Sequence, residues 1–338
     1  MLLPAFIFCE FIQNFHIKYY NLIFQSFIGC MTLYLLGLLI GYISAKILNL
    51  NTNQTKFLCA VFSSPHTTSI PLILIEITHP VLANISQIVP ADGIMDVRSR
   101  GMLYIVLNSI FANLWRWTIT YNLINPEPPK ATPLELEENL IKNINHNFEK
   151  NKMTLSKFCK EIMNMPIIVS VFSLLLCLHP GIQKYFNTPD AFLYVTVLSV
   201  NKFAAKGYGF LVMFLLGVNF AELIFSDEKD ENKKIKKDII FSSCDLAFLT
   251  TVKLVIMPLL ASPFIIFLFI SQVITDDIMV FLFLFMAAAP NAINVIVVCS
   301  VKNAYVETVS LIMVVQYIVS MITLTFQISL IMWTLSMI

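Results

Sequence analysis

The sequence predicts an all-α protein that crosses a membrane several times, and three observations lead to this fold class. First, 57% of the 338 residues are hydrophobic and only 13% are charged, about half the charged share of a soluble domain. Second, the apolar residues form continuous runs of about 20, the length that a helix needs to cross a bilayer. Third, polarity does not alternate within these runs, which excludes transmembrane β-strands.

Nine segments are long and apolar enough to be predicted as spans, or nearly so. They are residues 1–13, 22–47, 56–78, 100–124, 165–179, 192–225, 239–271, 277–300 and 305–337. The first is short and is interrupted by Pro4 and Glu10, and it lacks the basic start and the cleavage site of a signal peptide. We therefore expect one further helix to precede Met1.

Two hydrophilic stretches, 125–164 and 226–238, separate the apolar runs. The predicted organisation is a first transmembrane repeat over 1–124, a cytosolic loop over 125–164 and a second transmembrane repeat over 165–338. With this loop in the cytosol, the cytosolic side carries 14 lysines. The opposite side carries 4 basic residues, or 6 with Lys202 and Lys206. Basic residues favour the cytosolic side, so the chain begins in the cytosol and ends outside.

Polar interruptions occur in one span of each half. Residues 63–69 are all Ser, Thr, Pro or His, and Pro290, Asn291 and Asn294 interrupt the span at 277–300. Proline removes a backbone donor, and unwound backbone inside a bilayer must be covered by protein or line a cavity. Two such breaks predict an inverted-repeat transporter with its binding site at mid-membrane. The N-termini of the half-helices favour an anion there.

Six segments, in this order, resemble the auxin efflux carrier family, which includes the plant PIN and PILS carriers. They are LPAFIF (3–8), IPLIL (70–74), WRWTITYNLI (115–124), FLLGVNFAEL (214–223), VKLVIMPLL (252–260) and AAAPNAINVIVV (287–298). The resemblance implies ten helices in two inverted five-helix repeats, here four plus five. It also implies that the fourth and ninth helices cross at the substrate site, and that organic anions move by an elevator-like motion.

The resemblance places some site residues and leaves others open. Pro290 and Asn294 match family positions, Asn219 lies in the LGVN motif, and Lys253 lies where family members often carry a basic residue. The first break departs from the family, because Pro65 to Ser69 replace small residues and asparagine. Auxin itself is therefore not implied as the substrate.

The candidate substrate-binding residues are Ser64, Pro65, His66, Thr67, Thr68, Ser69, Asn219, Lys253, Pro290, Asn291 and Asn294. Each has an ordinary structural alternative. The asparagines also suit interhelical hydrogen bonds, and the hydroxyls also suit capping of unwound backbone. His66 either binds an anion, carries a proton or makes a structural hydrogen bond. Lys253 serves as a substrate counter-charge or in an ion pair. We expect Arg116, between two tryptophans, to anchor at the membrane surface.

The resulting hypothesis is a carrier for small organic anions, indole or carboxylic acids, in the lipid bilayer. The alternative is a transporter-derived sensor that binds a ligand or lipid without flux. An enzyme is disfavoured, because the sequence shows no cluster of metal ligands and no nucleophile–base pair, and no cofactor is expected. A net charge of +1 without a basic face argues against nucleic acid. The short loop favours the endoplasmic reticulum over the plasma membrane, and a homodimer is left open.

Overall fold

The computed structural model describes residues 20–85, 96–125, 165–177, 179–207 and 240–337, and the isolated positions 5, 8, 9, 12, 13, 214 and 218. This part of the chain is helical and contains no β-strand, which confirms the all-α class. Its helices are α2 (Tyr20–Ile47), α3 (Thr52–Phe62), α4 (Ser69–Ile85), α5 (Val97–Trp115), η2 (Arg116–Thr120), α6 (Tyr121–Leu123), α9 (Met165–Cys177), α10 (Pro180–Asn187), η3 (Tyr194–Leu198), α11 (Ser199–Lys206), α13 (Ser243–Thr251), η4 (Val252–Ile256), α14 (Met257–Ile270), α15 (Asp277–Ala288), α16 (Asn294–Lys302) and α17 (Val306–Met337). The three η segments are π-helices.

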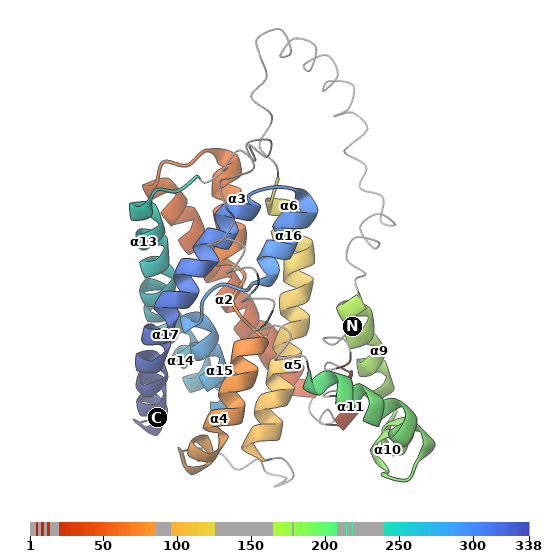
Figure 1. Cartoon of the computed structure of the whole chain (residues 1–338). Helices are drawn as coiled ribbons and strands as arrows, with labels where there is room; N and C mark the ends of the chain where they lie inside the picture. Colours follow the sequence, from red (N-terminus) through yellow and green to blue (C-terminus); the bar gives the residue numbers. More distant parts are fainter. Residues whose placement is uncertain are drawn as a thin grey trace, which may run out of the picture.

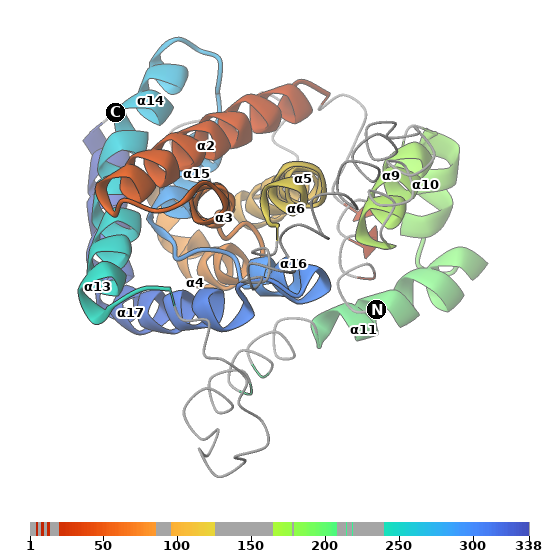
Figure 2. The ribbon, with the colours of Figure 1, turned by 90° about the horizontal axis from the view of Figure 1, so that it is seen from above.

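The described helices form two groups. Helices α2–α6 and α13–α17 make the larger group, and α9, α10 and α11 lie beside it (Figures 1 and 2). Helix α5 belongs to the buried cores of both groups. Its Tyr104 and Ile105 lie in the core of the larger group, and its Leu103, Val106 and Leu107 pack in a second core with residues such as Phe186. The contact between the two groups therefore depends on α5.

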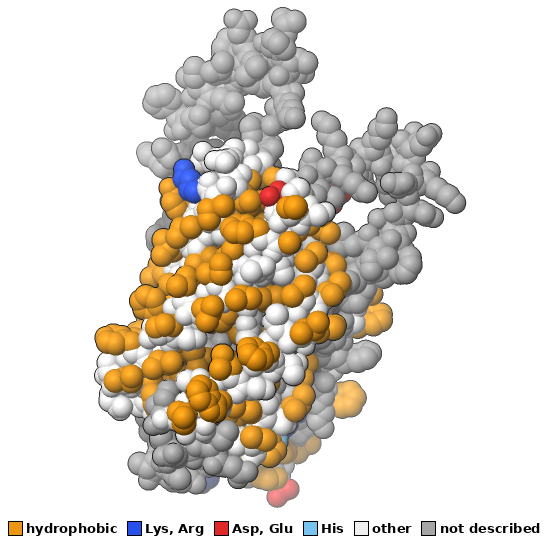
Figure 3. Space-filling model, turned by 90° about the vertical axis from the view of Figure 1, so that its left-hand side faces the viewer, with side chains coloured by type: hydrophobic (Ala, Val, Ile, Leu, Met, Phe, Trp, Pro, Cys, Tyr) orange, Lys and Arg blue, Asp and Glu red, His pale blue; other side chains and the backbone are white. Residues whose placement is uncertain are grey.

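Within the described part of the chain, three helical segments are long and apolar enough to cross a membrane: Asn21–Ile47, Ser243–Ile270 and Val306–Met337. Their outward faces carry large exposed apolar side chains, such as Leu39, Phe267 and Ile322. Figure 3 shows one side of the molecule covered by hydrophobic side chains, with the coloured charges near its upper and lower ends. Such a surface is unfavourable in water and suits lipid, so we treat the chain as an integral membrane protein.

The same order of elements occurs twice along the chain. A long helix, two short helices separated by a break, and a second long helix appear first as α2, α3, α4 and α5. They appear again as α13 with α14, then α15, α16 and α17. The predicted spans 56–78 and 277–300 are both interrupted, because α3 ends at Phe62 before α4 begins, and α15 ends at Ala288 before α16 begins. Helix α10 is a short addition that hydropathy did not predict.

Local signals explain where several of these helices begin. Asn51 and Gln54 form a reciprocal capping box at the start of α3, and Ser242 and Asp245 form another at the start of α13. Each pair satisfies backbone N–H groups that have no partner within the helix. The long segment Ser243–Ile270 therefore starts at a polar cap directly before an apolar run, as the short helix α3 does.

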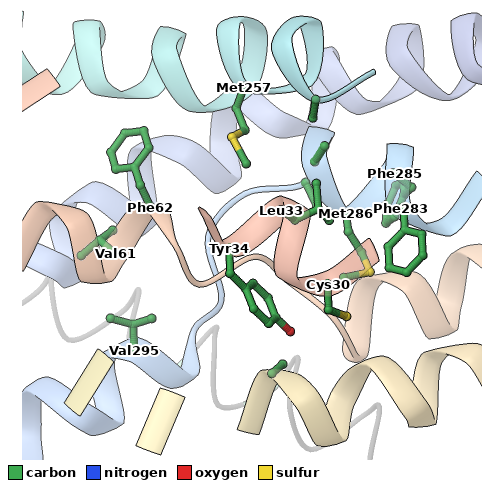
Figure 4. Close-up of a cluster of buried hydrophobic side chains, with 14 of the residues drawn as sticks. Cys30, Leu33, Tyr34, Val61, Phe62, Met257, Phe283, Phe285, Met286 and Val295 are labelled. Carbon is green, nitrogen blue, oxygen red and sulfur yellow. The ribbon is translucent and has the colours of Figure 1, made fainter. Parts of the chain in front are cut away.

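Helix α15 lies at the centre of the larger group. Every residue from Ile278 to Ala288 is buried, as expected for a helix that is apolar on all sides. Phe283, Phe285 and Met286 project from it among side chains of α2, α3, α14 and α16 (Figure 4). The second break follows directly after this buried helix, so its position is fixed by the core.

Two glycines allow α2 to approach the first break closely. Gly37 and Gly41 are four residues apart in α2, the small-xxx-small spacing that brings membrane helices together. A Cβ at Gly37 would lie 2.4 Å from the carbonyl oxygen of Phe62 and 2.7 Å from the Cα of Ser63. A Cβ at Gly41 would lie 2.8 Å from the Cα of Cys59. The end of α3 is thus held against bare α2 backbone.

We expect Gly37→Ala to destabilise the protein. Alanine within a helix normally gains about 0.5–1 kcal/mol over glycine, but here the new Cβ would meet backbone that has no side-chain freedom, and overpacking costs about 1–3 kcal/mol. The measurement is the thermal unfolding midpoint of the purified protein in detergent. Gly181→Ala is the control, because its Cβ would meet only the His179 ring, at 3.2 Å. A higher midpoint for Gly37→Ala would contradict the packing.

Candidate functional site

The two breaks meet and satisfy each other's backbone. The N–H of Ala292 donates to the carbonyl oxygen of Ser64 at 2.9 Å. Pro65 and Asn291 form an isolated antiparallel bridge at the same place. Unwound backbone in a membrane must find such partners within the protein. The geometry therefore brings Ser64, Pro65 and Asn291 together, although they are far apart in the sequence.

Hydroxyl groups tie the first break to its neighbours. The Ser64 hydroxyl donates to the Ala60 carbonyl at 2.9 Å and lies 3.1 Å from the Thr120 hydroxyl. The Thr68 hydroxyl lies 2.8 Å from that of Ser109 in α5. The capping role considered for these side chains is thus present for Ser64, while Thr68 is held by α5.

A narrow pocket lies beside the meeting point of the breaks. It holds about 270 Å³ of empty space, its open mouth included. Five of the predicted residues line it, together with three others: His66, Thr67, Thr68, Ser69 and Asn294, with Arg116, Ala292 and Ile293. Thr67 to Ser69 stand at the start of α4, and Ala292 to Asn294 stand at the start of α16. Two helix N-termini and an arginine at one pocket favour an anion.

Arg116 is the cation of this pocket, and its predicted role as a surface anchor was wrong. The side chain is buried, with 4% of its surface exposed, and its Nη1 donates to the side-chain amide oxygen (Oδ1) of Asn113 at 2.8 Å. Arg116 is the first residue of the π-helix η2. A π turn holds more residues than an α turn, so a helical wheel drawn from the sequence misplaces side chains at this point.

Asn291 lies behind the pocket rather than in it. Its backbone N–H donates to the Gln316 side chain at 3.2 Å, and the Tyr317 hydroxyl donates to its carbonyl at 3.4 Å. Its side-chain amide is fully buried and makes no hydrogen bond within the described residues. The His66 ring stands edge-on to the Tyr317 ring, with centroids 6.2 Å apart. Asn291 and His66 are therefore both held in place by contacts with Gln316 or Tyr317 of α17.

Lys253 is fully buried but does not line the pocket. It lies in the π-helix η4, and its amino group has no hydrogen-bond partner among the residues that the structure describes. The positive charges of Lys253 and Arg116 both repel the protonated form of the His66 ring. Of the other predicted site residues, Pro290 is buried within the second break, and Asn219 lies outside the described residues.

A buried ion pair at the opposite end of the larger group was not predicted. Arg100 of α5 donates to the Asp276 carboxylate at 2.7 Å, and so does the Tyr104 hydroxyl. Asp276 also accepts the Ile278 N–H at 2.9 Å and so caps α15. The charge count placed Arg100 among the four basic residues on the side opposite the cytosol, whereas the structure buries its side chain. Hydropathy and charge counts carry no signal for a pair 176 residues apart.

No metal centre is present among the described residues, since no group of three or more His, Cys, Asp or Glu side chains comes together there. What the pocket can do is hydrogen-bond and attract a small anion. It combines hydroxyls, a side-chain amide, an imidazole and a guanidinium.

Comparisons with known proteins identify the family of the chain. The chain is 20% identical over 329 residues to an uncharacterized transporter of Schizosaccharomyces pombe (strain 972), covering 80% of this chain and 72% of that protein. No solved structure matches the chain. A family described as "Membrane transport protein" matches residues 1–328, nearly the whole length. The resemblance of its motifs is thereby confirmed, and the chain belongs to the membrane transport protein family, the family of the auxin efflux carriers.

Proposed function

We propose that the chain is a secondary transporter that moves small organic anions by alternating access, with the substrate held where its two broken helices cross. The observation that carries the proposal is the pocket at the two breaks, where the starts of α4 and α16 and the guanidinium of Arg116 face one space. An anion there is attracted by two helix N-termini and one fixed positive charge.

The size and lining of the pocket narrow the substrate class. Its empty space of about 270 Å³ includes the open mouth, so the enclosed part is much smaller than the pockets of drug-sized ligands, which hold about 300–1,000 Å³. Hydroxyl and amide groups outnumber aromatic ones in its lining. A small carboxylate therefore suits this pocket better than a bulky indole acid, and the uptake test below includes both classes.

The two groups of helices supply the two bodies that alternating access requires. Both breaks belong to the larger group, and α9–α11 stand beside it across α5 (Figure 2). The side of α5 that faces this second group is apolar, with Leu103, Val106 and Leu107. We propose that the larger group moves along this apolar contact, which has few directional bonds to break.

The test is substrate uptake into proteoliposomes, with a panel of small carboxylates that includes indole-3-acetate. We expect saturable uptake by the wild type, and at least a tenfold loss with Asn294→Ala, because the amide is one of the directional groups at the start of α16. Phe267→Ala, on an exposed apolar face of α14, is the control and should transport normally. Binding without uptake by any variant would replace the carrier with the ligand sensor.

A further inference from the structure

A second pocket opens at the end of α2, and it shares no lining residue with the pocket at the two breaks. It holds about 710 Å³ of empty space, its mouth included. The lining comes from the last turns of α2, the start of α3 and the end of α6: Leu38, Tyr42, Lys46, Leu50, Thr52, Thr55, Lys56, Cys59 and Leu123. Lysine bias places this end of the molecule on the cytosolic side.

The charge of this pocket is uncompensated within the described residues. Lys46 and Lys56 both line it, and no acidic side chain does. Lys46 lies over the Tyr42 ring at 5.5 Å, and neither lysine forms an ion pair among the described residues. The hydroxyls of Thr52 and Thr55 stand between the two lysines along the chain. Two cations with hydroxyl groups suit a phosphate.

The position of the pocket argues for a lipid rather than a soluble ligand. Lys46 is in the last turn of a segment that is long and apolar enough to span the bilayer, Asn21–Ile47, so its amino group lies at the depth of the headgroups. Leu38, Tyr42 and Lys46, which line the pocket, are spaced four residues apart on one face of α2. The exposed apolar side chains of Leu39 and Ile43 lie next to them along the helix. A headgroup in the pocket would leave its acyl chains on this apolar face.

We propose that this pocket binds the phosphate headgroup of an anionic phospholipid of the cytosolic leaflet. Lys46 and Lys56 pair with the phosphate, and the Thr52 hydroxyl donates a further hydrogen bond to it, while the Thr55 hydroxyl donates to the Asn51 carbonyl oxygen at 2.8 Å. The acyl chains lie along the exposed apolar face of α2. The end of α2 connects directly to α3, which leads into the first break, so a bound lipid would steady the helix that carries the break.

The experiment is native mass spectrometry of the full chain, released from detergent after incubation with phosphatidylserine, phosphatidylinositol or phosphatidylcholine of matched acyl chains. We expect preferential retention of the two anionic lipids. Each lysine changed to glutamine should reduce that preference about fivefold, the effect of one basic residue near an anionic surface. Lys46→Gln/Lys56→Gln should therefore bind all three lipids alike.

Three controls keep the outcome decisive. Lys184→Gln removes an exposed lysine of α10 and should leave the preference intact. Lys46→Arg/Lys56→Arg keeps both charges and should retain binding, which separates loss of charge from misfolding. Unchanged lipid preference in the double glutamine variant would overturn the proposal. So would displacement of the lipid by millimolar inorganic phosphate, since that result would assign the pocket to a soluble anion.

Discussion

Changing Arg116 to glutamine is expected to raise the half-saturating substrate concentration about 10- to 100-fold, because a hydrogen bond to a charged group contributes about 1.5–3 kcal/mol. Arg116 is the one arginine that lines the pocket, and its guanidinium is buried, so water screens its charge little. Glutamine keeps a donor but removes the charge. Concentration-dependent uptake into proteoliposomes measures the effect.

Two further variants separate the charge of Arg116 from its structural contacts. Arg116→Lys keeps a positive charge and should recover part of the affinity, although lysine cannot copy the planar fork of arginine. Arg98→Gln removes an arginine that is half exposed and bonded to Glu76, and it should leave uptake unchanged. If Arg116→Gln saturates at the wild-type concentration while remaining folded, Arg116 does not face the substrate.

The positions of the spans and of their breaks could be predicted from the sequence, because lipid restricts the backbone strongly. In a bilayer only continuous helices satisfy every backbone group, so runs such as 22–47 and 305–337 correspond closely to α2 and α17. Proline and a run of polar residues mark the places where this rule is broken. Both breaks accordingly fall at these residues, between α3 and α4 and between α15 and α16.

The directions of individual side chains could not be predicted in the same way. A polar residue in a span points toward protein, but the sequence does not say toward which neighbour. Arg116 and Lys253 both lie in π-helices, which shift the register of every side chain that follows. The predicted set thus contained Lys253, which does not reach the pocket, and assigned Arg116 to the membrane surface.

The second large effect concerns stability: Asp276→Asn is expected to lower the free energy of unfolding by about 3–5 kcal/mol, the cost of breaking a buried ion pair by removing one of its charges. Arg100 is the charge left behind, since its carboxylate partner at 2.7 Å would become a neutral amide. Asparagine has one oxygen for the Ile278 N–H, so it still caps the start of α15, but its NH2 group then takes the place of the oxygen that accepts from Arg100 and Tyr104. The loss therefore combines the removed charge with the changed hydrogen bond to Tyr104. Thermal unfolding in detergent measures it.

The double variant makes the argument quantitative. Arg100→Met/Asp276→Asn removes both charges, and we expect it to unfold at a higher temperature than Asp276→Asn alone, because no unpaired charge remains buried. The exposed pair Arg98 and Glu76 is the comparison, since its side chains are 51% and 40% exposed and such pairs contribute about 0–1 kcal/mol. Additive losses from Arg100→Met and Asp276→Asn would show that the pair contributes no coupling.

The same variants bear on the transport mechanism. The pair joins α5, which packs against both groups of helices, to α15, whose end leads into the second break. If α5 and α15 move together during transport, the pair stays intact throughout the cycle. The double variant should then transport at the wild-type rate per folded molecule despite its changed stability. A changed rate in this variant would instead mean that α5 and α15 separate during the cycle, so that Arg100 and Asp276 part and meet again at each turnover.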